Sequence, residues 1–390
     1  MFVPVSMTSR VGGAGLLALV ATYGIGRLAY GLFVPRFRAE FGLSLDVLGY
    51  VASAAQAGFL LAAVVTGVLA ARFGPRLPVV SGCVLLAVGA ALTAAASGPV
   101  LLAVGVIAAG TSAGGTWAPF SDAVDNQVPP SGRRRALALV NAGSSVGLVL
   151  ASVLVLLAGD HWRAVWWGFT VVGIITAAAA WRVLEPEVVH PAPDGNRPRP
   201  GWFFTSWSVQ LFVVALGLSI TSGAYFAYAP DTAQDAGMAS WIGPAMWATL
   251  GVAGTSVGAF GGGIADRYGS RWPLAVMLLL VGGSTVLLLA GPGSVPAALG
   301  SAALFGVGFT TGFALIMIWS QQVFHERPTT GFTLAIVFMA AGFSVGPSLF
   351  GVLATLLGRP TALLAAAMPA FLVALVPRSR ENRRRCHHLR

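Results

Sequence analysis

The chain has 390 residues, of which 56% are hydrophobic and only 9% are charged, and its mean hydropathy is +0.80. Soluble domains contain about a quarter charged residues, so this composition excludes a soluble globular protein and indicates one that lies in a membrane. The net charge of +10 comes from arginines in short loops and in the tail instead of on one folded basic face, so we expect no nucleic-acid partner.

Twelve apolar stretches are long enough to cross a bilayer, which takes about 20 mostly apolar residues. The first six are expected at 11–35, 47–71, 77–97, 100–124, 136–159 and 163–184. The second six are expected at 205–230, 242–266, 273–291, 296–320, 331–357 and 361–377. The first stretch is longer than the apolar core of a signal peptide and is therefore predicted to be a membrane helix. The sequence thus predicts an all-α membrane protein with twelve transmembrane helices.

A polar segment separates these stretches into two sets of six. Residues 185–201 contain five prolines and several charges, a composition that predicts an extended linker. We therefore expect an N-terminal six-helix bundle over 1–184 and a C-terminal six-helix bundle over 202–377. Residues 378–390 form a basic tail, which we expect to lie free or on anionic lipid.

The arginines predict the orientation, because cytoplasmic loops are enriched in basic residues. With both termini in the cytoplasm, 18 arginines fall on the inner side and four on the outer side. The outer four are Arg36, Arg38, Arg163 and Arg359. Both termini, the linker and the tail are therefore predicted to be cytoplasmic.

The second half of the chain repeats features of the first half. The segment Gly67–Arg76 returns as Gly262–Arg271, 195 residues later. Other matched pairs are Tyr30 with Tyr225, Pro35 with Pro230, Gly143 with Gly342 and Gly147 with Gly346. Repeated turn and packing residues indicate a duplicated unit, and an even number of spans in each unit gives the two copies the same orientation.

The pattern Gly-x-x-x-Asp-Arg-x-Gly-x-Arg over 262–271, its copy over 67–76 with Ala71 in place of aspartate, and the two six-helix halves resemble the major facilitator superfamily. Within it, the segment Tyr23–Tyr30 followed by Pro35 resembles the YbfB-like bacterial branch, which supplies no substrate. The resemblance implies alternating access by rocking of the halves, with the first, fourth, seventh and tenth helices around the cavity.

Arg27 is the basic residue that the predicted spans place deepest in the membrane. Its burial in hydrocarbon costs about 2.5–3.5 kcal/mol or more, so the side chain should face a cavity or a partner. Tyr23, Arg27 and Tyr30 follow a spacing that places them on one face of a regular helix. No acid is expected at the same depth, so Arg27 is a candidate site for a carboxylate or phosphate. The alternatives are an arginine tied to a carbonyl or amide of a neighbouring helix, or one that reaches outward.

Three further residues are candidate substrate contacts: Trp117 in the fourth helix, and Ser222 and Tyr225 in the seventh. Rings and hydroxyls around one arginine suit a small organic anion, although each of these residues can equally pack helices together. The repeat places Ser222 opposite Arg27, so the charge occurs in only one half. Asp122 is a candidate proton carrier. The alternative is an interfacial acid paired with Arg133–Arg135.

The repeated loop is a candidate gate on the cytoplasmic side. Asp266 is expected to face the positive N-terminus of the fifth helix when that side is closed. The other predicted gating residues are Gly262, Arg267, Gly269 and Arg271, with Arg72 in the first copy.

The function predicted from the sequence is a secondary transporter that moves a small organic solute, an organic anion, by alternating access. Proton-coupled efflux of amphipathic drugs or metabolites is an alternative, and a non-transporting membrane sensor on the same fold is another. Cys83 and Cys386 and the five histidines lack the spacing of metal ligands, and no catalytic motif is visible. We therefore expect no enzyme activity, no cofactor and no metal. We expect a monomer in the bilayer of a bacterial plasma or inner membrane, with a small-molecule substrate and protons as a candidate coupling ion.

Overall fold

The computed structural model describes residues 7–185, 205–258, 271–325 and 328–376, and in these ranges the chain forms helices and no strands. Ten helical segments of the described residues are long and apolar enough to cross a membrane, and the helices α11 and α16 are shorter. Each of the twelve predicted stretches coincides with one helical segment, although 242–266 is described only as far as Gly258. The predicted all-α membrane fold is confirmed at this level.

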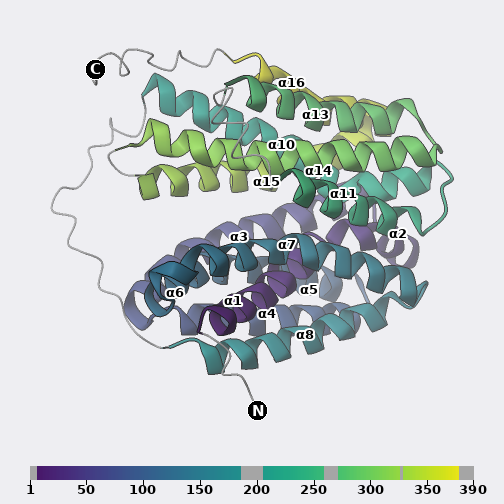
Figure 1. The fold of residues 1–390 in the computed structure, drawn as a ribbon. Coiled ribbons are helices and arrows are strands. Elements are labelled where there is room, and N and C mark those ends of the chain that lie inside the picture. The colour runs from purple at the N-terminus through teal and green to yellow at the C-terminus, as the bar shows by residue number, and fades with distance from the viewer. Residues whose placement is uncertain (1–6, 186–204, 259–270, 326–327, 377–390) are drawn as a thin grey trace, which may run out of the picture.

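The segments of the first half are α1 (Met7–Leu19), η1 (Val20–Arg27), α2 (Tyr30–Phe41), α3 (Leu45–Phe73), α4 (Arg76–Ala94), α5 (Pro99–Thr111), η2 (Ser112–Gly115), α6 (Trp117–Gln127), α7 (Pro130–Ala158) and α8 (Trp162–Val183). Those of the second half are α10 (Ser206–Asp235), α11 (Ile242–Gly258), α13 (Arg271–Ala290), α14 (Val295–Val323), α15 (Pro328–Leu357) and α16 (Arg359–Ala374). Figure 1 shows α1 to α8 as one group of helices and α10 to α16 as a second group beside it. We refer to them as the N-terminal group and the C-terminal group.

Within the described residues, two of the spans contain a break in the regular α-helix. The first runs from α1 through the π-helix η1 into α2, and Leu28 donates its backbone N–H to the carbonyl of Tyr23 at 3.1 Å, a spacing of five residues. The fourth runs from α5 through the 3₁₀ turn η2 into α6, where Gly114 and Gly115 approach the backbones of α3 and α4. Short π and 3₁₀ segments inside long helices often occur at functional sites.

Glycines allow the close helix crossings within each group. A side chain at Gly143 or Gly147 on α7 would collide with the backbone of α1 and η1. A side chain at Gly342 or Gly346 on α15 would likewise collide with the backbone of α10. The sequence repeat therefore marks positions at which two backbones meet, as is common in membrane helix packing.

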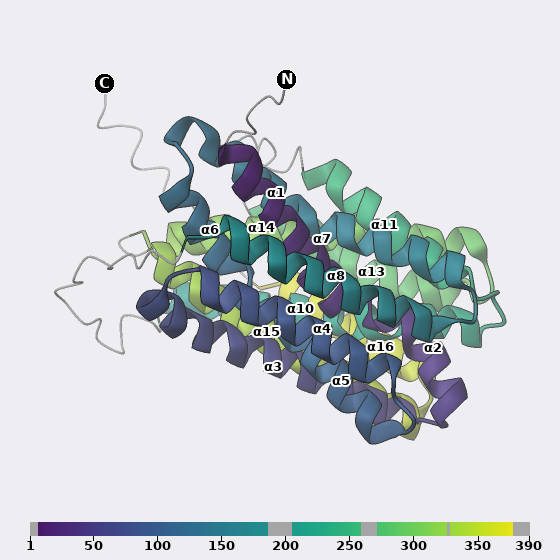
Figure 2. The same ribbon diagram turned by 90° about the horizontal axis from the view of Figure 1, so that it is seen from below.

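The two groups meet along several helix pairs. In the structure α3 packs along α15, α7 along α11, and α2 against α10. Figure 2, which turns the molecule by 90°, shows α7 and α11 side by side and α3 beside α15. The interrupted helix η1 reaches the region between the groups, because its last residue, Arg27, lies against rings of both α3 and α15.

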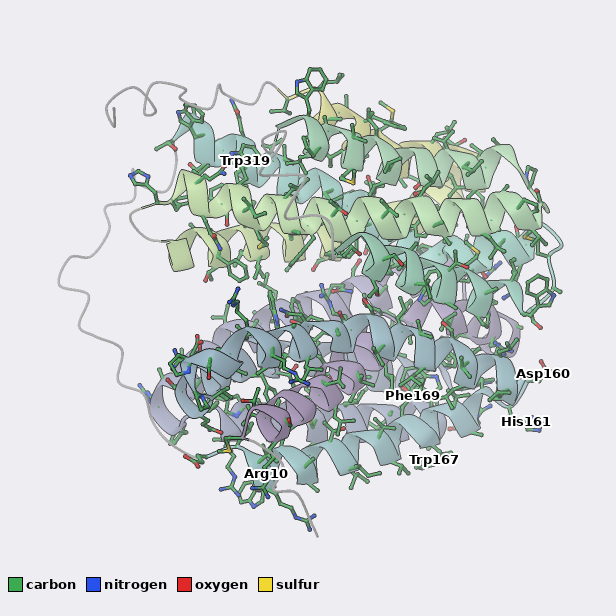
Figure 3. The ribbon with its side chains drawn as sticks, viewed as in Figure 1. Arg10, Asp160, His161, Trp167, Phe169 and Trp319 are labelled. Carbon is green, nitrogen blue, oxygen red and sulfur yellow. The ribbon has the colours of Figure 1, made fainter. Side chains whose placement is uncertain are left out.

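The side chains of α8 show which face of this helix is exposed on the outside of the bundle and which face is buried. Trp167 points away from the bundle and is 49% exposed, whereas Phe169 points inward and is fully buried (Figure 3). The same figure shows Arg10 at one end of the bundle and Asp160 and His161 at the other. We refer to these as the Arg10 end and the Asp160 end.

Candidate functional site

Arg27 is the last residue of η1, and its guanidinium lies among aromatic rings between the two groups. The guanidinium carbon is 4.0 Å from the ring centre of Phe59 on α3 and 5.1 Å from that of Phe343 on α15. The ring of Tyr23 is 5.6 Å away. A cation held against aromatic faces is stabilised by their quadrupoles, so these rings offset part of the cost of the charge.

One polar side chain orients the guanidinium. The Nε of Arg27 donates a hydrogen bond of 2.9 Å to Oε1 of Gln56 on α3. Within the described residues Arg27 makes no ion pair, and its two terminal Nη groups donate no hydrogen bond. The Nη edge is therefore available to an acceptor that enters the site, and carboxylates bind such an edge in a two-pronged manner.

Arg27 lines two small cavities. The larger has a volume of about 60 Å³ and is bounded by residues of η1, α3, α6, α14 and α15. The smaller has about 20 Å³ and is bounded by residues of η1, α2, α3, α5, α10 and α15. All four helices that the family resemblance implies, the first, fourth, seventh and tenth, contribute to these walls, together with α3 and α15. Each cavity holds a few waters at most, so a solute needs the groups to separate.

Tyr23 and Tyr30 both lie beside Arg27, but in different cavities. Tyr23 lines the larger cavity, and the ring of Tyr30 lines the smaller one. The hydroxyl of Tyr30 donates to the backbone carbonyl of Leu48 at 2.9 Å. The predicted single face is divided because the π-helical turn and the break at Leu28 replace the regular helical period.

Trp117, a candidate substrate contact from the sequence, lies in the wall of the larger cavity. Its Nε1 donates to Oδ1 of Asn141 on α7 at 2.9 Å. Its ring is 6.5 Å from Phe313 on α14 and 5.7 Å from Phe332 on α15. Trp117 therefore bridges the two groups on the side of the cavity toward the Arg10 end.

Tyr225 and Ser222 are placed away from both cavities. Tyr225 stacks on Phe305 at 4.0 Å between ring centres, and its hydroxyl lies 2.8 Å from that of Ser301, inside the C-terminal group. Ser222 is fully buried and donates to the carbonyl of Leu218 at 2.7 Å. The structure does not bring either residue to Arg27.

The glycine contacts also change which residues of the first half correspond to which residues of the second half. Gly147 meets Gly24, and Gly346 meets Ala224. Thr22 bonds the carbonyl four residues before it, as Ser222 does. By these contacts Ser222 corresponds to Thr22, and Arg27 corresponds to Ala227, so the charge remains confined to one half.

Sequence reasoning missed the phenylalanines that line the larger cavity together with Arg27. Phe59, Phe309, Phe313 and Phe343 are phenylalanines in long apolar runs, and nothing in such a run distinguishes a ring that faces a cavity from one that faces lipid. Gln56 was visible as an amide in an apolar helix, and its spacing along α3 from Phe59 could have shown that the two share one helical face.

Asp122 is exposed on α6, and it forms no ion pair with Arg133, Arg134 or Arg135 in the structure. Arg133 instead donates its Nε to the carbonyl of Val128 at 3.0 Å. Asp122 does not line either Arg27 cavity. The interfacial pairing predicted as its alternative role is therefore not formed.

The predicted gate lies mostly outside the described residues. Gly262, Asp266, Arg267 and Gly269 fall in the stretch 259–270, and the side chain of Arg271 is likewise not described. In the first copy, Arg72 is exposed near the end of α3.

A cluster of four charged side chains joins the groups toward the Asp160 end. Asp231 on α10 is 2% exposed and receives Arg38 of α2 at 3.0 Å and Arg359 of α16 at 2.8 Å. Asp235, one turn further on, accepts Nε of Arg359 at 3.0 Å. Arg38 comes from the N-terminal group, and the other three come from the C-terminal group. We call these four residues the ion cluster.

Hydrogen bonds between the groups lie toward the same end. Tyr228 donates its hydroxyl to the carbonyl of Leu45 at 2.6 Å, and Trp247 donates its Nε1 to that of Leu28 at 3.0 Å. The hydroxyl of Ser348 lies 2.6 Å from that of Ser53. The groups are thus joined between the Asp160 end and the site.

Comparisons with known proteins agree with the helical membrane fold described above. The family model of the Major Facilitator Superfamily matches residues 16–332. A probable anion transporter of the chloroplast of Oryza sativa subsp. japonica is 30% identical over 160 residues, which are 40% of this chain and 26% of that protein. The chain therefore matches only about a quarter of the length of this curated relative.

Two solved structures share the fold over almost their whole length. The nucleoside transporter NupG, in a mutant form, has a TM-score of 0.81 at 10% identity over 95% of this chain and 98% of that chain. A bacterial homologue of the human lysosomal transporter Spinster has a TM-score of 0.77 at 14% identity over 94% of each chain. The relatives are transport proteins, in agreement with the prediction that the chain is not an enzyme. The match over most of its length shows that the chain belongs to the major facilitator superfamily.

Proposed function

We propose that this protein is a secondary transporter that carries a small organic anion across the membrane by alternating access. The observation that carries the proposal is the Nη edge of Arg27, which borders a cavity between the two groups and is compensated by no acid among the described residues. A buried, orientated guanidinium without an acidic partner is a site for an anion. Gln56 occupies Nε alone, so it orients the arginine without neutralising it.

Alternating access requires two bodies that move against each other. We assign them to residues 1–184 and 202–377, joined by the linker 185–201 and followed by the tail 378–390, with both termini in the cytoplasm. The matched glycine contacts of α7 with α1 and η1 and of α15 with α10 support two copies of one unit. The excess of arginines on one side supports the orientation.

The contacts between the groups favour one state of such a cycle. In the proposed orientation the Asp160 end faces outward, and there the ion cluster and the bonds of Tyr228 and Trp247 join the groups. This arrangement corresponds to a conformation closed to the outside. The return step then requires the predicted inner gate at Asp266.

Two alternatives lead to different expectations. Proton-coupled efflux of amphipathic compounds would use a titrating carboxylate, and Asp122 does not line either Arg27 cavity. A non-transporting sensor would show binding without turnover. A monomer in a bacterial inner membrane and membership of the YbfB-like branch remain our expectations.

Uptake into proteoliposomes tests the proposal. The purified protein is reconstituted, and accumulation of radiolabelled organic acids is measured with and without an imposed pH gradient. We expect saturable uptake that is lost in Arg27→Ala and retained in Arg182→Ala, which removes an exposed arginine at the end of α8 outside the cavities. Equal uptake of the same anion by wild type and Arg27→Ala, with unchanged affinity, would contradict the anion site. Dependence on the pH gradient identifies protons as the coupling ion.

A further inference from the structure

The walls of the larger cavity beside Arg27 are aromatic and aliphatic. Six rings from both groups line it, and the remaining wall is formed by aliphatic side chains of α15. The rings belong to Tyr23, Phe59, Trp117, Phe309, Phe313 and Phe343. Phe309 and Phe313, both on α14, are partly exposed, so part of each ring surface is free to contact another molecule.

Polar groups in this wall are few. Besides Arg27, the described side chains that line the cavity offer only the hydroxyl of Tyr23 and the indole nitrogen of Trp117. The indole nitrogen already donates to Asn141. A solute with many hydroxyls would lose its hydrogen bonds to water without gaining partners here, which is unfavourable for each hydroxyl that is buried. The wall therefore selects against sugars and other polyhydroxylated solutes.

The charge in the wall is single and positive. In the part of the chain that the structure describes, Arg27 is the one charged residue that lines either cavity. Its faces lie toward Phe59 and Phe343, and Gln56 holds its Nε, so a ligand meets it only at the Nη edge. That edge accommodates one planar anionic group, and a cationic solute would be repelled.

The rings lie where the body of such a ligand would extend. The rings of Trp117 and Phe313 come from different groups and lie 6.5 Å apart between centres with a tilt of 53°, in the cavity that Arg27 also lines. A flat apolar body next to the Nη edge would be buried among these rings, and aromatic pairs prefer ring centres about 4.5–7 Å apart. Entry of the body requires these rings to separate, as movement of the groups would allow.

We infer that the substrate is a monoanion with a flat apolar body, of the class of aromatic carboxylates. The inference rests on the proposed function, since it names the substrate class of the same site. It adds that the affinity is divided between one ionic contact at Arg27 and ring contacts across the two groups.

Binding of three probes to the purified protein tests the inference. The probes are 2-naphthoate, its uncharged amide 2-naphthamide, and gluconate, which has the carboxylate and a polyhydroxylated body. Dissociation constants are measured by isothermal titration calorimetry. We expect 2-naphthoate to bind at least about 10-fold more tightly than either of the other two, because one lacks the charge and the other lacks the ring.

Two variants locate the ring contact. Phe313→Leu should weaken 2-naphthoate by about 2- to 10-fold and leave gluconate unchanged, since a ring contact contributes this much beyond area burial. Trp167→Leu removes an aromatic side chain that points away from the bundle and should change neither probe. The unfolding temperature of each variant is measured to confirm that it is folded.

The outcomes separate the two ideas. If gluconate binds as tightly as 2-naphthoate and Phe313→Leu has no effect, the inference is wrong and the anion site remains. If 2-naphthamide binds as tightly as 2-naphthoate, the anion site itself is wrong. If none of the probes binds, the inference is wrong, and the uptake assay decides on the proposed function.

Discussion

At Arg27 the protein retains a charge that a membrane interior opposes, and its surroundings explain how. Ring faces of Phe59 and Phe343 lie against the guanidinium, and Gln56 accepts the Nε hydrogen. These contacts use the faces and one corner of the group, and they leave the Nη edge for a ligand. The guanidinium is thus held in position while its Nη groups still lack acceptors among the described residues, which is expected of a binding residue before its ligand arrives.

The planar shape of the guanidinium should contribute to carboxylate affinity as much as its charge does. Arg27→Lys keeps a positive charge but loses the planar edge that two carboxylate oxygens can share. We expect the dissociation constant for a carboxylate substrate to rise about 10-fold, measured by calorimetry on the folded variant. Affinity equal to that of the wild type would show that a point charge is sufficient.

Gln56 offers a test that leaves Arg27 in place. Gln56→Glu has nearly the same shape but would pair its carboxylate with Arg27 and neutralise the site. We expect at least a 10-fold loss of anion affinity without a fall in unfolding temperature, because hydrogen bonds to charged groups contribute about 1.5–3 kcal/mol. Gln127→Glu, on α6 outside the two cavities, is the matched control and should have no effect on affinity. Retained affinity in Gln56→Glu would contradict a free Nη edge.

The sequence predicted some of these residues and missed others for physical reasons. Arg27, Tyr23, Tyr30 and Trp117 stood out because charge and hydrogen-bonding groups are costly in lipid, and all four line the cavities. Tyr225 carries the same signal, yet its hydroxyl meets Ser301 inside the C-terminal group. A polar group in a membrane helix needs a partner, but the sequence does not say whether that partner is a neighbour or a ligand.

At the scale of helices, the twelve spans followed from hydropathy, whereas their interruptions did not. The π-helix η1 sits in an apolar run with two glycines that a regular helix would tolerate equally well. Its extra residue per turn changes which side chains share a face, so Tyr23 and Tyr30 point into different cavities. Boundaries depend on composition, but local helix type depends on the neighbours against which the helix packs.

The helix crossings should depend on the repeated glycines. A valine at Gly147 would place its Cβ against the carbonyl of Val20 and within 2.9 Å of Cα of Gly24. We expect Gly147→Val to destabilise the protein by about 1–3 kcal/mol, the usual cost of overpacking, and to lower its unfolding temperature. Gly168→Val, where no atom lies within 4 Å, is the control and should leave the unfolding temperature within a degree or two of the wild type. An equal effect of the two changes would contradict the close crossing.

At the scale of the whole molecule, the proposed transport cycle gives different roles to the ion cluster and to the Arg27 site. Asp231 is almost fully buried between two arginines, and only Arg38 comes from the opposite group. A buried ion pair adds little net stability by itself, but the removal of one partner leaves an uncompensated charge. The cluster therefore favours the state in which the Asp160 end is closed.

Removal of Arg38 should loosen that closed state. We expect Arg38→Gln to increase, several-fold, the rate at which a membrane-impermeant maleimide added from outside labels a cysteine introduced at Ala52, which lines the smaller cavity. Arg163→Gln breaks the pair with Glu40 inside the N-terminal group and should leave that rate unchanged. Identical labelling in both variants would contradict a closing role for the ion cluster.

The inner gate predicted from the repeat is the counterpart of the ion cluster. We expect Asp266→Asn to insert normally but to slow transport, because the amide no longer attracts the positive N-terminus of α7. Turnover in proteoliposomes and labelling of cavity cysteines from the inside check this expectation. Wild-type turnover together with wild-type labelling would remove Asp266 from the gate.

The central claim is that the Nη edge of Arg27 holds the anionic group of the substrate, and a thermodynamic cycle tests it directly. Dissociation constants are measured for an acid and its uncharged amide, each with wild type and with Arg27→Ala. If the guanidinium of Arg27 contacts the carboxylate of the ligand, the effects on binding free energy of removing the carboxylate charge and of removing the arginine are not additive. We predict a coupling of about 2 kcal/mol, or roughly 30-fold in affinity. A coupling of zero, with the acid favoured equally by both proteins, would contradict the account.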